Sequence, residues 1–197
     1  MYPLFESVQL IDACIMRWER HCRRMHDSLQ TLGLPDADYL TIKKSILQQA
    51  TSGIQKARIL YDGDGFSIDL FTYHIRPLRQ LHLITDNNIS YTLKYTDRSC
   101  FEKYTRGLTS EEDVLFVKEG KITDTSFSNI ALLQDGIWYT PSTPLLKGTR
   151  RAELVESGLI QEREIWMTEL NKYTQLSCIN AMLNIGDLCV KPPEYKP

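Results

Sequence analysis

The sequence lacks several patterns that are typical of well-known protein classes. No apolar run approaches the roughly 20 residues that a helix needs to span a bilayer, so we expect no membrane partner. No basic stripe with interleaved aromatic residues is present and the net charge is −2, which argues against nucleic acid as a partner. The first ten residues include Glu6 and lack the positively charged start of a signal peptide. We therefore expect a soluble protein without a signal peptide.

Patterns for disulfides, metals and common catalytic motifs are also missing. The five cysteines are odd in number and form no C-x-x-C pair, and free thiols in a reducing cytoplasm explain them better than disulfides or zinc. The four histidines lack metal-ligand spacing. Neither a G-x-S-x-G nucleophile motif nor the glycine spacing of a nucleotide P-loop occurs. The sequence thus predicts a cytoplasmic protein with no metal site.

The chain does contain a mixture of helix and strand patterns. Its 197 residues, 42% of them apolar, lie near the border between one domain and two and are enough for a packed core. Apolar spacing and end signals predict helices at 17–33, 38–52 and 149–157, with short ones after Asp97 and at 168–173. Alternation and turn signals predict strands at 5–10, 57–61, 80–84, 89–93, 114–118, 129–133 and 137–140, and one from the turn at 62–65 through Tyr73.

The order of these elements indicates the fold class and a domain boundary. Strands and helices mix without regular alternation, which favours α+β over a doubly wound sheet. The stretch 76–80, with Pro77 and two arginines, reads as a connector between two halves. We therefore expect a smaller N-terminal α+β domain at 1–79 and a larger C-terminal domain at 80–197.

Two segments about thirty residues apart carry groups that pyridoxal phosphate chemistry requires. Lys94 follows the expected strand 89–93, and a lysine partly buried there would have its pKa lowered by desolvation and become nucleophilic; the alternative is a solvated surface lysine. Asp124 follows a hairpin turn among hydroxyl residues and can pair with a ring nitrogen; the alternative is a turn aspartate that binds its own backbone. A Schiff-base lysine and an acid at the pyridinium nitrogen together form such a site.

A third segment has the features of a phosphate site. Gly148, Thr149 and Arg150 enter the expected helix at 149–157, and N–H groups at a helix start with a hydroxyl and cations nearby bind phosphate. The alternative is an N-cap by Thr149 beside two solvated arginines. Arg24, on the first expected helix, either faces a phosphate or belongs to a solvated helix face.

In their order and spacing these segments resemble one family, the class IV aminotransferases, which are fold-type IV pyridoxal phosphate enzymes. Residues 4–8 look like the family's F-E-T strand, and 21–25 look like its H-x-x-R-L helix, which implies that Arg24 binds the cofactor phosphate. Lys94 occupies the Schiff-base position, and residues 122–124 occupy the V-T-E position, where Asp124 is one methylene shorter than the family's glutamate.

The second half of the chain continues the resemblance. Ser128 and Asn129 look like the family's S-N step, and residues 139–141 match Y-T-P. Residues 148–151 are similar to the phosphate-binding G-I-T-R turn, which implies that Gly148, Thr149 and Arg150 contact the phosphate. The resemblance implies a two-domain fold like that of D-amino-acid aminotransferase, with pyridoxal 5'-phosphate in the cleft between the domains, and a homodimer.

Two short motifs favour one branch of the family, the 4-amino-4-deoxychorismate lyases. Lys94 is followed by residues 95–98, similar to the lyases' K-H-L-N-R, and Asn180 lies in a stretch that resembles their N-A-L. This resemblance implies a lyase of folate biosynthesis that forms 4-aminobenzoate and pyruvate, with Arg98 and Asn180 at the substrate's carboxylates. An aminotransferase for branched-chain or D-amino acids, and a non-catalytic family member, are the alternatives.

Overall fold

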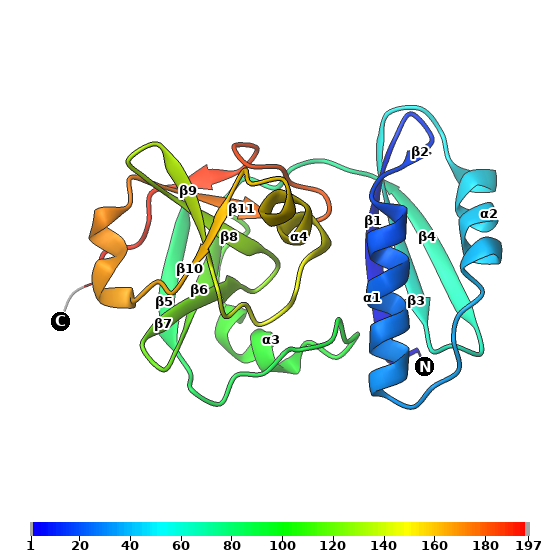
Figure 1. The fold of residues 1–197 in the computed structure, drawn as a ribbon, viewed down its shortest axis with the longest axis horizontal. Helices are drawn as coiled ribbons and strands as arrows, with labels where there is room; N and C mark the ends of the chain where they lie inside the picture. The colour runs from blue at the N-terminus through cyan, green and yellow to red at the C-terminus, as the bar shows by residue number, and fades with distance from the viewer. Residues whose placement is uncertain (1, 196–197) are drawn as a thin grey trace. The chain divides into compact units, whose positions relative to one another are not determined.

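The computed structural model describes residues 2–195 of the chain, which form two compact units (Figure 1). Unit 1 comprises Met1–His74 and Leu93–Asp97, and unit 2 comprises Ile75–Thr92 and Arg98–Pro197. The chain first passes from unit 1 to unit 2 at His74–Ile75, just before the connector that the sequence predicts at 76–80. Both units mix helices with mainly antiparallel strands, so the predicted α+β class is confirmed.

Unit 1 is built on a four-stranded antiparallel sheet in the order β2-β1-β3-β4. Figure 1 shows helix α1 beside β1 and helix α2 beside β4. The bounds are β1 Leu4–Ile11, β2 Cys14–Ile15, α1 Trp18–Thr31, α2 Tyr39–Gln49, β3 Ile54–Tyr61 and β4 Phe66–Thr72.

The core of unit 1 lies between one sheet face and the two helices. Leu4 and Val8 on β1 lie on the same face as Ala57 on β3, because side chains alternate across a strand and these positions pair in register. Met25 and Leu29, four residues apart on α1, are fully buried against this face. The predicted helix at 17–33 is therefore confirmed, with Trp18–Thr31 as its bounds.

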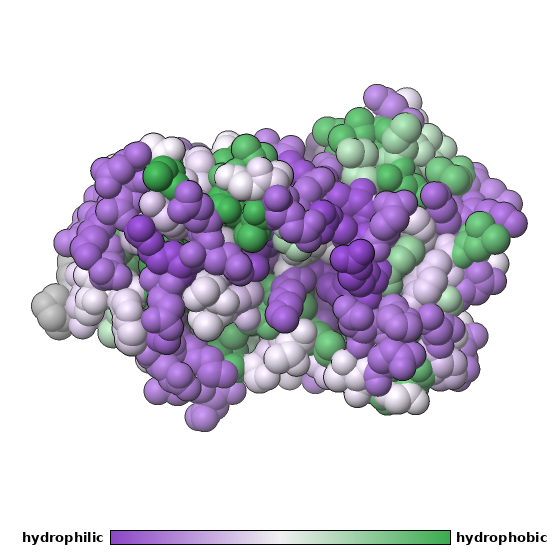
Figure 2. Space-filling view, in the orientation of Figure 1, coloured by the Kyte–Doolittle hydropathy of each residue, from purple (hydrophilic) through white to green (hydrophobic). Residues whose placement is uncertain are grey.

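Exposed apolar side chains of unit 1 gather at one end of its sheet. Figure 2 shows an apolar patch at the upper right, over the region of the β1–β2 hairpin, on a face that is otherwise largely hydrophilic. Ile11 and Ile54 are cross-strand partners there and both are exposed. Other exposed apolar side chains of unit 1, such as Leu40 and Leu47, lie on α2.

Unit 2 contains two sheets. The three-stranded sheet has the order β5-β6-β7, with β5 parallel to β6, and the five-stranded sheet has the order β10-β9-β8-β11-β12. The strands are β5 Gln80–Thr85, β6 Glu112–Lys118, β7 Lys121–Thr125, β8 Asn129–Gln134, β9 Ile137–Pro141, β10 Gln161–Arg163, β11 Gln175–Ile179 and β12 Cys189–Val190. The helices are α3 Ser99–Thr105, α4 Thr149–Glu156 and the 3₁₀ helix η1 Met167–Lys172.

One apolar core joins the two sheets of unit 2. It includes Leu115 and Ile122 from the three-stranded sheet, and Leu132 and Leu176 from the five-stranded sheet. Two hairpins build this arrangement, and their turns at Glu119-Gly120 and Asp135-Gly136 have positive φ at both residues, which is the backbone conformation of a type I′ turn. A short turn at 126–128 connects β7 to β8.

Two sequence expectations about strands are wrong. The stretch 89–93 is not a strand, because the backbone groups of Ile89 bond to the Asp86 carbonyl and to the Lys118 amine instead of a neighbouring strand. Residues 121–125, expected to be a polar turn region, form strand β7. The β-branched residues Ile122, Thr123 and Thr125 are the signal that identifies this strand.

The segment that carries Lys94 belongs to unit 1, whereas the sequence analysis assigned this lysine to the C-terminal domain. Tyr95 forms an isolated antiparallel bridge with Leu4, and the Phe5 N–H donates to the Lys94 carbonyl at 3.0 Å. The Thr96 N–H donates to the Pro3 carbonyl at 2.8 Å. These long-range backbone hydrogen bonds fix the segment to β1, and no local sequence pattern reports them.

Candidate active site

Asp124 is a buried carboxylate on strand β7. Its side chain is 4% exposed, Oδ1 accepts a hydrogen bond from Nδ2 of Asn129 at 2.9 Å, and Oδ2 accepts one from the Leu146 N–H at 3.0 Å. Burial raises the pKa of Asp124 to about 6, against the opposing effect of these two hydrogen bonds. A carboxylate has about four lone-pair sites, so each oxygen can accept one further bond, such as that from a pyridinium N–H.

Asn129 connects this carboxylate to the chain that precedes helix α4. Its Nδ2 donates both to Asp124 and to the Leu146 carbonyl, the latter at 2.8 Å. Gly148 passes so close that a Cβ placed on it would lie 1.9 Å from Oδ1 of Asn129. The backbone of Gly148 is extended, at φ −72° and ψ 141°, so this close approach rather than an unusual φ requires the glycine.

Helix α4 begins at Thr149 with unpaired polar groups. The first intrahelical bond shown at this end runs from the Ala152 N–H to the Gly148 carbonyl, and the preceding N–H groups have no acceptor within the helix. Oγ1 of Thr149 is buried and has no hydrogen-bond partner among the described residues. Helix N–H groups beside an unpaired buried hydroxyl are suited to bind a phosphate oxygen.

The two arginines that follow Thr149 have different surroundings. Arg150 donates to the Glu153 carboxylate and to the Asn184 side-chain oxygen, while its buried Nε lacks a partner in the described structure. Arg151 donates to the Pro141 carbonyl at 2.7 Å and to a Glu162 oxygen at 2.5 Å. Arg151 therefore braces α4 against β9 and β10.

Ser128 closes the turn between β7 and β8. Its carbonyl accepts from the Thr125 N–H at 2.9 Å, and its hydroxyl lies 2.9 Å from the Thr125 hydroxyl. The turn brings Asp124, on β7, next to Asn129, on β8. The sequence analysis found Asp124, Asn129, Gly148 and Thr149 in separate segments of the chain. The structure places these four residues in one cluster of unit 2.

Arg24 lies in unit 1, where it is paired with a buried glutamate. Glu6 accepts from Nε of Arg24 at 2.7 Å and from its terminal nitrogen at 2.5 Å, and His21 Nδ1 lies 2.8 Å from the same carboxylate. Burial alone would raise the pKa of Glu6, but the Arg24 charge and the His21 hydrogen bond hold it well below its usual range. Burial also lowers the pKa of His21, against the opposing effect of its contact with Glu6.

The sequence analysis did not identify Glu6 and His21 as partners of Arg24. The available signal was a charged residue on the apolar face of β1, between Leu4 and Val8. The bidentate contact with Glu6 fixes the plane of the Arg24 guanidinium.

Lys94 is half-buried, and its Nζ lies 4.5 Å from the centroid of the Phe5 ring. This is within the range of a cation–π contact. The amine of Lys94 thus lies over a side chain of the strand that the sequence analysis likened to the family's F-E-T segment.

Arg98 and Asn180 contact the β7–β8 turn. Arg98 donates to the Ser126 carbonyl, and Asn180 Nδ2 donates to the Phe127 carbonyl at 3.3 Å. Both residues belong to unit 2. Their role at substrate carboxylates stays a prediction.

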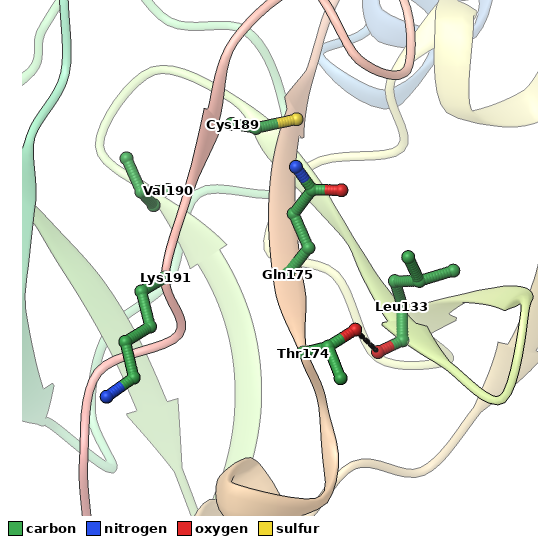
Figure 3. Close-up of a pocket in the computed structure, with 6 residues that line it drawn as sticks. All are labelled: Leu133, Thr174, Gln175, Cys189, Val190 and Lys191. Atoms are coloured by element: carbon green, nitrogen blue, oxygen red, sulfur yellow. Dashed lines mark hydrogen bonds between the residues drawn. The ribbon is translucent and has the colours of Figure 1, made fainter.

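A surface pocket of about 400 Å³ lies elsewhere in unit 2 (Figure 3). It is lined by Leu133, Thr174, Gln175, Cys189, Val190 and Lys191. In Figure 3 a hydrogen bond joins the Thr174 hydroxyl to the Leu133 carbonyl at one end. None of the predicted site residues lines this pocket, so it is not the predicted cofactor site.

Residues 2–195 contain neither a candidate metal-binding cluster nor a candidate membrane-spanning helix. No group of three or more histidine, cysteine, aspartate or glutamate side chains there could hold a metal ion. Within the same residues, no helix has both the length and the apolar content needed to cross a membrane.

The comparison with known protein families matches residues 3–188 to the class IV aminotransferase model. The chain therefore belongs to the class IV aminotransferase family, and the resemblance inferred from the sequence is confirmed. Family members bind pyridoxal phosphate or its amine form, and a hypothetical aminotransferase from Mycobacterium tuberculosis is one whose structure contains the amine form with α-ketoglutarate. That structure is similar with a TM-score of 0.79 at 16% identity, covering 100% of this chain and 84% of that one, which shows the shared fold.

Two curated relatives cover most of this chain. An uncharacterized protein of Haemophilus influenzae is 32% identical over 185 residues, which are 92% of this chain and 98% of that protein. A protein of Schizosaccharomyces pombe, provisionally named an aminodeoxychorismate lyase, is 29% identical over 186 residues, 81% of this chain and 75% of that one.

A solved structure has a related provisional name. It is a 4-amino-4-deoxychorismate lyase, so named provisionally, from Haemophilus somnus, and it matches with a TM-score of 0.84 and 29% identity. The match covers 92% of this chain and 97% of that one.

The residues of this chain fit the family's cofactor. The unpaired buried hydroxyl of Thr149 at a helix start suits the phosphate, and the partly paired, buried carboxylate of Asp124 suits the ring nitrogen. Asp124 is shorter than the usual glutamate, but two hydrogen-bond donors fix its position.

Proposed function

We propose that this protein is a pyridoxal phosphate-dependent lyase that converts 4-amino-4-deoxychorismate to 4-aminobenzoate and pyruvate. The observation that carries the cofactor assignment is the buried pair of Asp124 and Asn129 beside the unpaired Thr149 hydroxyl. The choice of substrate is supported by the two relatives with provisional lyase names, each 29% identical to this chain.

Each residue has a defined task under this proposal. Lys94 holds the cofactor through its amine and later takes the proton from the substrate carbon that carries nitrogen. Asp124 keeps the proton on the ring nitrogen, because a nearby carboxylate stabilises the positive charge. Arg24, Thr149 and Arg150 bind the phosphate.

The chemistry of the substrate favours elimination. When bound, pyridoxal phosphate supplies an electron sink for the electron pair left as that proton departs. The ring C–O bond to the enolpyruvyl group then breaks and the ring becomes aromatic, while the released enolpyruvate takes up one proton and leaves as pyruvate. Aromatisation drives the reaction forward, and no second amino acceptor is needed because the amino group stays on the aromatic product.

Two measurements test the cofactor chemistry. Pyridoxal phosphate added to the purified protein should give a visible absorbance band that is absent in Lys94→Ala and present in Lys172→Ala, a surface-lysine control. After borohydride reduction, mass spectrometry should find the cofactor covalently attached to the peptide containing Lys94. No band and no attachment in the wild type would overturn the cofactor assignment.

The substrate assignment is tested by product analysis. The cofactor-loaded protein given 4-amino-4-deoxychorismate should release 4-aminobenzoate and pyruvate in equal amounts. Formation of keto acids from branched-chain or D-amino acids, with no aromatic product, would identify an aminotransferase instead. Bound cofactor with no turnover of either substrate class would identify a non-catalytic family member.

The resemblance to the family also leads us to propose a homodimer. One chain has a mass of 22.8 kDa. Light scattering of the purified protein at micromolar concentration should give twice this mass. A monomer mass under those conditions would refute this part of the proposal.

A further inference from the structure

The turn between β7 and β8 is held by side chains from distant parts of unit 2. At Ser126, the N–H donates to Oδ2 of Asp113 at 3.3 Å, and the carbonyl accepts from a terminal nitrogen of Arg98. Asp113 lies on β6 and is 1% exposed, and Arg98 immediately precedes α3. Both backbone groups of Ser126 are therefore bonded to charged side chains.

The next residue of the turn is held in the same way. The Phe127 N–H donates to the Thr125 hydroxyl at 3.3 Å, and its carbonyl accepts from Nδ2 of Asn180 at 3.3 Å. Asn180 is itself fixed, because its Oδ1 accepts from the Met182 N–H at 2.8 Å. Thus all four backbone polar groups of Ser126 and Phe127 are bonded to side chains, three of which come from outside the turn.

Arg98 is held in place by more than its hydrogen bond to the turn. Its guanidinium carbon lies 4.9 Å from the centroid of the Phe101 ring and 5.6 Å from that of the Tyr91 ring. A second terminal nitrogen lies 3.4 Å from the Tyr91 hydroxyl. A guanidinium that packs against aromatic rings and bonds to a main-chain carbonyl has the geometry of a rigid support.

The position of this turn determines how Asp124 and Asn129 meet. The turn residues are the connection between β7, which carries Asp124, and β8, which begins at Asn129. We propose that Arg98 and Asn180 are positioning residues, which hold the Ser126–Phe127 turn so that Asn129 stays bonded to Asp124. The catalytic meaning of this proposal rests on the proposed function. Under the proposal, Arg98 and Asn180 support the turn instead of contacting the substrate's carboxylates directly.

The first test uses the cofactor-free protein. The Asp124 carboxyl is labelled with ¹³C and titrated by NMR in the wild type, Arg98→Lys and Asn180→Ala. The hydrogen bond from Asn129 stabilises the ionised carboxylate of Asp124. Loosening the turn should therefore move the titration midpoint to higher pH, which corresponds to about threefold tighter proton binding. Arg79→Lys and Asn88→Ala, on exposed residues of unit 2, are the controls and should leave the midpoint unchanged.

The second test measures the equilibrium binding of pyridoxal phosphate to the same variants. Arg98→Lys and Asn180→Ala should each raise its Kd by about tenfold, equivalent to the loss of one hydrogen bond. In an Asn129→Ala background the same changes should have little further effect, since the bond that they support is already gone.

The outcomes separate the two roles. If the variants keep the wild-type Asp124 midpoint and cofactor Kd while the KM for 4-amino-4-deoxychorismate rises, then Arg98 and Asn180 bind substrate and the inference is wrong. If Arg98→Lys does not fold, Asn180→Ala alone decides, since it leaves the arginine in place. A protein that binds no pyridoxal phosphate would refute the proposed function, whereas the NMR titration would still decide the role of the turn.

Discussion

Replacing Gly148 with alanine tests the geometry of the site directly. The added Cβ would lie 1.9 Å from Oδ1 of Asn129, well inside the 3.0 Å within which Cβ atoms essentially never approach another atom. Asn129 cannot yield without cost, because its amide is bonded to both Asp124 and Leu146. We therefore expect Gly148→Ala to displace Asn129 and break these bonds.

The expected destabilisation follows from the hydrogen bonds that are lost. A hydrogen bond to a charged group contributes about 1.5–3 kcal/mol and a neutral one about 1 kcal/mol, so the displacement of Asn129 should cost about 2–4 kcal/mol. Gly148 is also the N-cap of α4, and alanine there should add of order 0.5–1 kcal/mol. The second contribution does not depend on Asn129.

A double-mutant cycle separates these contributions. Gly148→Ala, Asn129→Ala and the double variant are compared by urea unfolding at pH 7 in a Trp18→Phe background. The remaining tryptophans, Trp138 and Trp166, both belong to unit 2 and report its unfolding. In the Asn129→Ala background, Gly148→Ala should cost only the N-cap contribution. The reasoning is refuted if Gly148→Ala costs the same in both backgrounds, because then the clash with Asn129 is not what destabilises the protein.

Three further predictions concern single residues. Since burial raises the pKa of Asp124 from 3.8 to about 6, the folded state binds its proton more tightly than the unfolded state does. The unfolding free energy should therefore fall by about 2.5 kcal/mol between pH 4 and 7 and then level off, and Asp124→Asn should abolish this decrease in urea titrations across pH. Arg24 and His21 hold the pKa of Glu6 below its usual range, so the stability that ionised Glu6 contributes is present at neutral pH and should be lost in acid. Glu6→Gln should lower the unfolding free energy by about 3–5 kcal/mol at pH 7 and make it less dependent on pH in the acid range. Equal acid dependence in the wild type and the variant would contradict this. Thr149→Val keeps the shape of the side chain and removes a hydroxyl that has no partner within the described structure. The unfolding free energy of the cofactor-free protein should therefore fall by less than about 1 kcal/mol, whereas the Kd for pyridoxal phosphate should rise by about tenfold. An unchanged Kd would place the phosphate elsewhere.

Local patterns in the sequence were enough to predict most of the helices and hairpins. Apolar spacing predicted the first helix, whose residues Met25 and Leu29 are buried, and the hairpin turns at Glu119-Gly120 and Asp135-Gly136 have positive φ at both residues. These features depend on residues a few positions apart, so a local pattern contains the necessary information. The family could also be identified from ordered short motifs, and the match over residues 3–188 confirms it.

Features that depend on distant partners could not be predicted in this way. The burial of the polar residues of β7, among them Thr123 and Asp124, depends on contacts with other strands, although β-branched residues gave a local signal for the strand itself. The pairing of Glu6 with Arg24 joins residues 18 positions apart, on a strand and a helix. The segment with Lys94 was assigned to the C-terminal half, but its backbone bonds to the first strand of unit 1.

The sequence by itself determined the residue types of the site: a lysine, a carboxylate, an S-N step and a glycine at the start of a helix. The tertiary structure decided how those of unit 2 act on each other, because burial and hydrogen bonding depend on the surroundings of a side chain rather than on its neighbours in sequence. It bonded Asn129 to Asp124, brought Gly148 against Asn129, and gave Arg98 a main-chain carbonyl as its partner. The chemical groups of the candidate site are therefore encoded locally, whereas their geometry and electrostatics come from the fold.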